Sequence, residues 1–314
     1  MKFTNKHKLP RPVARALAAD DYQRFGDFSA TELGKPPQIV QLCHRHDEDI
    51  VVEVMDNIWS LQGRALHYVM SLAQIEGSFV EERFLVDIDG VQVSMQSDYV
   101  YPIQGLEKQY AIIDHKNTSR YAIKEGVKKE WEEQINVYIY GWKMRGFSIS
   151  TAHVVAWLRD WSHTEAHVKK TYGYPKTPIV SLDVNIWPAS QTLQYLRERI
   201  KLHQDAQELP DHELPHCTLE ERWGKPDRFA AEFIEGKSKG KAVPKGSFFS
   251  TAAECDAFIE ERRSKATNKG GTIKAGFNDA KRVYHRGQSI RCERYCSARP
   301  FCHQYKTLIK KRPF

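Results

Sequence analysis

A chain of 314 residues with 41% hydrophobic and 28% charged side chains can bury a large core and has the composition of a globular protein. The mean hydropathy is −0.59, and no apolar run approaches the ~20 residues of a bilayer-spanning helix, which argues against a membrane protein. The first 20 residues are basic and lack the apolar stretch of a secretory signal, so we expect a cytoplasmic location. In that reducing compartment, six cysteines indicate metal binding or simple burial rather than disulfides.

Charge is distributed unevenly along the chain. Residues 236–314 contain 19 Lys and Arg against 6 Asp and Glu, a net charge of +13, whereas residues 1–235 contain 28 against 34, a net charge of −6. Such asymmetry predicts a polyanionic partner for the C-terminal part. The alternative is a basic surface that only improves solubility.

The N-terminal third is expected to be mainly helical. Residues 1–28 are interpreted as a loosely attached basic arm, after which Ser29 and Glu32 have the spacing of a helix capping box. A second helix is predicted over residues 39–46, and a longer one over residues 47–74, where apolar residues recur every three or four positions.

Gly63 and His67 lie one turn apart on the longer predicted helix. A glycine inside a helix indicates close approach by another backbone, which would place His67 in a crowded, partly polar site. The alternative is a histidine that only fills an interface between elements.

A block of strands follows. Residues 83–88 and 91–95 flank Asp89-Gly90, which is a strong signal for a two-residue hairpin turn. The second strand leads to Asp98, which stands among strand-forming residues. A third strand is predicted over residues 110–113 and is expected to end at Asp114.

Asp114 and Lys116 stand two positions apart and should therefore share one face of the chain. Neighbouring strands lie about 4.8 Å apart, so Asp98 and Asp114 could both reach one metal ion. A carboxylate beside a lysine can hold a hard divalent cation and stabilise charge on an attacked phosphate. The alternative is an ordinary ion pair.

The rest of the N-terminal domain alternates between helix and strand. A helix predicted over residues 128–145 carries Gln134 and Tyr138 on one face, although they could simply belong to its amphipathic surface. A strand over residues 151–158, a loop over 160–188 and a helix over 189–208 complete the domain, which we delimit as residues 29–209.

Residues 210–314 are predicted to form a basic α+β module, with a strand near 229–234 and a helix near 251–264. Cys292, Cys296 and Cys302 stand within eleven residues of one another, and a metal bound by them needs a fourth ligand. Cys217 is favoured because it opens this module, and the other candidates are Cys43, Cys255 and His303. Four thiolates suit an iron–sulfur cluster or zinc, and the alternative is unliganded buried cysteines.

The motifs in their order resemble the RecB-like branch of the PD-(D/E)XK nucleases. That resemblance rests on Gly63…His67, Asp98, Asp114-His115-Lys116, Gln134…Tyr138 and the clustered cysteines. The resemblance covers about residues 29–160 and the cysteine-rich tail. Within the branch, the chain is most similar to phage exonuclease-like proteins and CRISPR-adaptation nucleases with four-cysteine clusters. It implies an α/β fold with a mixed sheet flanked by helices, plus a small cysteine-containing C-terminal module.

The resemblance also assigns roles to single residues. It implies Mg²⁺ or Mn²⁺ held by His67, Asp98, Asp114 and the backbone carbonyl of His115. Lys116 would orient or deprotonate the attacking water. It also implies that Gln134 and Tyr138 position the DNA. The implied ligands of a 4Fe–4S cluster (alternatively zinc) are Cys217, Cys292, Cys296 and Cys302.

The function expected from this resemblance is a metal-dependent DNA exonuclease acting on single strands or duplex ends. It would serve phage or bacterial recombination, repair or DNA processing, in a bacterial or phage-infected cytosol, with a recombination or helicase partner. One alternative is a catalytically silent nuclease fold that binds DNA through the basic C-terminal region. Another is an accessory factor for an RNA or protein partner.

Overall fold

The computed structural model describes residues 1–310 apart from 20–22, 24, 170–171, 244–247, 268–270 and 275. The chain forms two compact units, of which the second is His216–Arg299 and the first comprises Met1–Pro215 and Pro300–Phe314. The sequence analysis placed the boundary at residue 210 and assigned the whole of 210–314 to one module. In the structure, the segment that begins at Pro300 instead belongs to the first unit.

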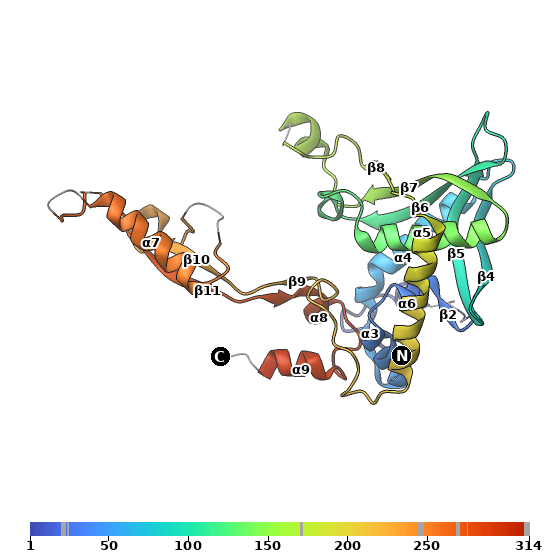
Figure 1. Ribbon diagram of the computed structural model, residues 1–314, viewed down its shortest axis with the longest axis horizontal. Helices are drawn as coiled ribbons and strands as arrows, with labels where there is room; N and C mark the ends of the chain where they lie inside the picture. Colours follow the sequence, from blue (N-terminus) through green and yellow to red (C-terminus); the bar gives the residue numbers. More distant parts are fainter. Residues whose placement is uncertain are drawn as a thin grey trace. The chain divides into compact units, whose positions relative to one another are not determined.

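The first unit is an α/β structure built on a six-stranded mixed sheet, as expected (Figure 1). The strands run in the order β2-β5-β6-β7-β8, and β4 pairs with β5. The pairs β2/β5 and β6/β7 are parallel, whereas β4/β5, β5/β6 and β7/β8 are antiparallel. The bounds of the strands are Phe28–Ser29 for β2, Phe79–Ile88 for β4, Val91–Pro102 for β5, Gln109–Thr118 for β6, Ser148–Leu158 for β7 and Ile179–Asp183 for β8.

Helices flank this sheet. Helix α5 packs against β4, β5, β6 and β7, and α6 packs against α5, α2 and α3, while α4 contacts β5 and β6 (Figure 1). Among the described residues, no helix is both long and apolar enough to cross a membrane. The helices are α1 Arg11–Ala18, α2 Ala30–Leu33, α3 Pro37–Arg45, α4 Ile58–Ser71, α5 Lys129–Met144 and α6 Ala189–Gln207.

Helix α5 lies so close to the sheet at Gly141 that a side chain there would collide with β4 and β5. A Cβ atom at Gly141 would come within 2.4 Å of Met95 Sδ and 2.8 Å of Phe84 Cε2. One residue along the helix, Trp142 is fully buried, and its Nε1 donates a hydrogen bond to Ser97 Oγ at 2.9 Å. This contact fixes the height of α5 above the strands and therefore the positions of its polar side chains.

The hairpin between β4 and β5 has the predicted turn. Asp89 and Gly90 both have positive φ, 52° and 88°, as a type I′ turn requires. The turn sets the pairing of the two strands from Ile88↔Val91 outward. Capping-box hydrogen bonds between Ser29 and Glu32 likewise confirm the helix start that was predicted there.

Several elements differ from expectation because their partners are distant in sequence. The first residues are packed rather than loosely attached: β1 (Lys2–Thr4) pairs with β3 (Val51–Glu53), and Leu17 is 1% exposed. That pairing, with the short η1 (Asp47–Asp49) and η2 (Val54–Asn57) turns, replaces the first part of the helix predicted over 47–74. The loop predicted over 160–188 contains η4 (Thr164–Val168) and β8.

The second unit has its own small core. Strands β10 (Arg228–Phe233) and β11 (Ala280–His285) pair antiparallel, and α7 (Ala252–Ala266) packs on both, so the predicted strand and helix are confirmed. Strands β9 (Gly224–Lys225) and β12 (Gln288–Ser289) form a second pair, followed by α8 (Ile290–Arg294). Parts of the Gly- and Lys-rich loops predicted here lie outside the described residues. The buried core residues are Ala231, Cys255, Ile259 and Ala280.

The C-terminal segment returns to the first unit. Phe301 stacks on His46 with ring centroids 4.1 Å apart, and α9 (His303–Lys310) follows. Cys302 is buried, and its Sγ donates to Gln38 Oε1 on α3 at 3.6 Å.

Candidate functional site

The site begins where the ladder between β5 and β6 stops. The last regular pair there is Tyr99↔Ile113, which places Asp98 and Asp114 next to each other across the two strands. At this point His115 N donates its hydrogen bond to a side chain, Asp98 Oδ2, at 2.6 Å. The side chain of Asp98 thus takes the place of a strand hydrogen bond and is held rigidly beside β6.

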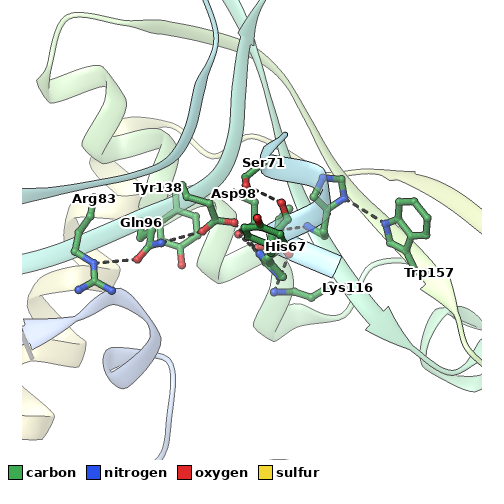
Figure 2. A network of polar contacts seen from close by, with 12 residues as sticks. His67, Ser71, Arg83, Gln96, Asp98, Lys116, Tyr138 and Trp157 are labelled. Atoms are coloured by element: carbon green, nitrogen blue, oxygen red, sulfur yellow. Dashed lines mark hydrogen bonds and ion pairs between the residues drawn. The ribbon is translucent and has the colours of Figure 1, made fainter. Parts of the chain in front are cut away.

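A histidine from α4 and an acid from β4 complete a compact group around Asp98. His67 Nδ1 lies 2.9 Å from Glu81 Oε1 and 3.6 Å from Asp98 Oδ1. His67, Glu81 and Asp98 each offer a ligand atom within 4.8 Å of the others, and within the described part of the chain no other set of three His, Cys, Asp or Glu does so. Figure 2 shows His67 and Asp98 together at the middle of a row of polar contacts.

Glu81 was not identified from the sequence. It has φ 51°, in the left-handed region that a non-glycine residue rarely adopts, and the β4/β5 pairing skips it between Val80↔Tyr99 and Glu82↔Ser97. The signal that locates it is the hairpin itself. Counting outward from the two-residue turn at Asp89-Gly90 places Glu81 opposite Asp98.

A second polar chain leads from β6 to α5. Lys116 Nζ lies 2.7 Å from Asp114 Oδ2 and donates to Gln134 Oε1 at 2.9 Å, and Gln134 Nε2 donates to Tyr138 OH at 2.8 Å. Asp114 is 2% exposed. Its buried Oδ2 is in contact with Lys116 Nζ and has no other polar partner among the described residues. That oxygen is therefore an acceptor with room for another partner.

The position of Asp114 corrects one prediction. Strand β6 does not end at residue 113 but continues through Asp114 and Lys116 to Thr118, paired all the way with β7. Both side chains are therefore fixed by a regular ladder rather than by a strand end.

His115 points the other way from its neighbours, because successive side chains of a strand alternate between faces. Trp157 Nε1 donates to its Nδ1 at 3.3 Å, and its buried Nε2 has no hydrogen-bond partner among the residues that the structure describes. Burial lowers the pKa of His115. The expected role of its backbone carbonyl as a metal ligand stays a prediction.

Charge in the site is poorly compensated. Burial raises the pKa of Asp98 to about 7, and the nearby charge of Asp114 contributes in the same direction. The hydrogen bond to Glu81 raises the pKa of His67. Burial lowers the pKa of Lys116, but the charges of Asp114 and Asp98 outweigh it, so the net shift is upward. A nearby cation stabilises the charged form of a buried carboxylate such as that of Asp98.

These residues fit a hard divalent cation. Carboxylate oxygens are the preferred ligands of Mg²⁺, and a single imidazole is compatible with Mn²⁺. The buried Oδ2 of Asp114 supplies an oxygen beside Lys116, and His67, Glu81 and Asp98 supply the converging ligand atoms.

The cysteines of the predicted cluster are divided between the two units. Cys217, Cys292 and Cys296 belong to the second unit, and Cys302 belongs to the first. Within the second unit, Arg291 N donates to Arg222 O at 3.1 Å, and Arg222 Nε donates to Cys217 O at 3.3 Å. The segment with Cys217 is thereby tied to α8, which carries Cys292. The cluster stays a prediction.

The alternative fourth ligands lie in other surroundings. Cys255 is fully buried in the core of the second unit. Cys43 is half-buried on α3, and His303 is exposed at the start of α9.

Comparisons with known proteins leave the family open. No model of a known protein family matches the sequence, and no curated protein matches it either. Among solved structures, the crystal structure of SSO0001 aligns with 60% of this chain and 84% of that one, at 13% identity and a TM-score of 0.42. Similarity at this level identifies neither a family nor a function, so the RecB-like assignment stays a prediction.

Proposed function

We propose that this chain is a metal-dependent DNA nuclease of the RecB-like PD-(D/E)XK type, acting as an exonuclease. One observation carries the proposal. Residues from four separate elements, α4, β5, β6 and α5, meet in one polar network around two buried acids. Of the seven residues that the resemblance assigns to the nuclease site, six contribute side chains to it: His67, Asp98, Asp114, Lys116, Gln134 and Tyr138.

The acids and the histidine would hold the cation. Asp98 and Asp114 would be ligands, with His67 beside them and the His115 carbonyl as expected from the resemblance. When bound, Mg²⁺ or Mn²⁺ supplies neutralisation of phosphate charge and acidification of water.

Lys116 and α5 have separate roles in this proposal. The ammonium of Lys116 stays charged, because its pKa is raised, and would stabilise negative charge that builds on the phosphate. Gln134 holds Lys116 on one side and Tyr138 on the other. Burial raises the pKa of Tyr138 to about 12, so its hydroxyl stays protonated and would donate to a backbone phosphate, a contact that positions DNA without reading its sequence.

The test is digestion of end-labelled single- and double-stranded DNA. Wild-type protein should digest it with Mg²⁺ or Mn²⁺ and not with EDTA. Asp114→Asn and Lys116→Met should each lower the rate by at least about 100-fold, the scale expected for loss of an electrostatic catalytic group, while DNA binding persists. Lys143→Met, at the C-terminal end of α5, is the matched control.

A second candidate function is DNA binding without catalysis. The uneven charge of the chain favours it, because residues 236–314 have a net charge of +13. DNA binding by wild-type protein with no digestion in either metal would support this function and contradict the first.

A further inference from the structure

A cavity of about 370 Å³ lies beside the proposed metal site. Its lining includes two cations, Lys35 and Arg83, together with Gln96 and Tyr138. Ser29, Thr31 and Ser94, which carry hydroxyl groups, also line it. Its volume is within the range of ordinary ligand pockets.

Two of the lining residues connect this cavity directly to the site. Gln96 Nε2 donates to Glu81 Oε2 at 2.8 Å, and Glu81 in turn contacts His67. Tyr138 OH accepts from Gln134, which also binds Lys116. Figure 2 shows Arg83 and Gln96 at one end of the polar row, with Tyr138 between them and His67.

The lining is suited to an anion. The guanidinium of Arg83 is oriented by Gln96, whose Oε1 accepts from Arg83 Nε at 2.9 Å, and by the Gln23 carbonyl, which accepts from NH1 at 3.3 Å. Lys35 is exposed and supplies the second positive charge.

The acid in the wall is already compensated. Glu32 Oε2 accepts from Ser29 N at 2.9 Å in the capping box, and Oε1 lies 3.0 Å from His44 Nε2. Its charge therefore opposes an incoming anion less than that of an unpaired carboxylate. An arginine in a fixed orientation, a lysine and several hydroxyls are the groups that bind phosphate oxygens.

We infer that this cavity binds a phosphate group of the DNA strand, next to the bond that is cut. The inference rests on the proposed function and deepens it, because it places a strand contact at a defined side of the metal site. The phosphate could be the terminal phosphate of the strand or an internal one, and the chemistry of recognition is the same.

Binding of labelled single strands in EDTA tests this inference without requiring hydrolysis. Arg83→Gln and Lys35→Gln should each weaken binding about tenfold, the effect of removing one charge-assisted hydrogen bond, and should lower the slope of log K against log salt by about 0.7. Arg197→Gln is the matched control, because Arg197 pairs with Asp89 at the far end of the β4/β5 hairpin. Thermal melting of each variant checks that it is folded.

Oligonucleotides that carry a 5′-phosphate, a 3′-phosphate or neither separate the two sources. If the phosphate is terminal, wild type prefers one phosphorylated end and both variants lose that preference. If the phosphate is internal, both variants bind all three oligonucleotides more weakly than wild type does, and by the same factor. Binding by both variants that equals the Arg197→Gln control overturns the inference, even if the wild type digests DNA. Failure of wild type to digest DNA, with these binding losses intact, overturns the proposed function alone.

Discussion

Glu81 connects two parts of the site through its two carboxylate oxygens. Oε1 lies 2.9 Å from His67 Nδ1, and Oε2 accepts from Gln96 Nε2 at 2.8 Å. It therefore offers a ligand atom of its own and also orients His67, and on its other side it orients one wall of the proposed phosphate cavity. Groups that orient ligands in this way typically change metal affinity when they are replaced.

We predict that Glu81→Gln weakens Mn²⁺ binding by about 10–100-fold, because the amide keeps the size of the side chain but removes its charge. Isothermal titration of the full chain with Mn²⁺ measures this. The control is Glu82→Gln, since Glu82 is the next residue of β4 and pairs with Arg145 at 3.1 Å, away from His67. Equal Mn²⁺ affinities for the two variants would contradict the prediction.

The remaining residues of the site were accessible from sequence because they stand in local patterns. Asp114 and Lys116 follow a run of apolar residues, and Gln134 and Tyr138 are one helical turn apart. Whether an acid lies opposite Asp98 depends on register, which a pattern of hydrophobicity does not give. The turn does give it, since the two-residue loop at Asp89-Gly90 determines every pair along β4 and β5.

At the scale of elements, the distance of α5 from the sheet decides where Gln134 and Tyr138 lie. Gly141 allows that approach, because any side chain there would collide with Met95 and Phe84. The sequence analysis assigned a close approach to a different glycine, Gly63 on α4. That prediction is wrong: a Cβ at Gly63 would meet no atom of the described part of the chain within 4 Å.

We predict opposite effects of alanine at these two glycines. Gly141→Ala should destabilise the protein by about 1–3 kcal/mol through overpacking. Gly63→Ala should stabilise it by up to about 1 kcal/mol, since alanine favours the helix and the space is open. Thermal and urea unfolding of the two variants measure both values. A loss of stability at Gly63→Ala equal to that at Gly141→Ala would show that packing at α5 is not the cause.

Elements with local signals were predictable and elements with remote partners were not. The hairpin turn, the Ser29–Glu32 capping box and the periodicity of α5 and α6 each depend on residues close in sequence. Strand β3 exists because β1 pairs with it from almost fifty residues away, and β8 because it pairs with β7. Such short strands carry too little pattern of their own to be recognised.

At the scale of the whole molecule, the second unit holds the excess positive charge. His216–Arg299 contains 18 Lys and Arg against 11 Asp and Glu, a net charge of +7, and the rest of the chain contains 29 of each. The sequence analysis located the charge correctly toward the C-terminus. It could not foresee that the segment from Pro300 belongs to the first unit, because contacts such as that between Phe301 and His46 link residues far apart in sequence.

If the second unit binds DNA phosphates, reversing its charge should change the salt dependence of binding. We predict that Lys237→Glu, Lys239→Glu and Lys241→Glu together lower the slope of log K against log salt by about 0.7–0.9 for each phosphate that is no longer bound. A matched triple reversal at Lys2, Lys6 and Lys8, in the first unit, gives the control for net charge. The same slope in both triple variants would place residues 237–241 away from the DNA.

The cysteines give a prediction that involves both units. The predicted cluster is held by Cys217, Cys292, Cys296 and Cys302. Because metal ligation contributes to folding, Cys217→Ser should lose the metal and melt at a lower temperature. Cys255→Ser, in the core of the second unit, should keep the metal. Anaerobic purification with iron and zinc analysis measures this: a brown protein absorbing near ~400 nm indicates an iron–sulfur cluster, and a colourless zinc-loaded one indicates zinc. Loss of metal in Cys43→Ser but not in Cys217→Ser would assign the fourth ligand to α3 instead.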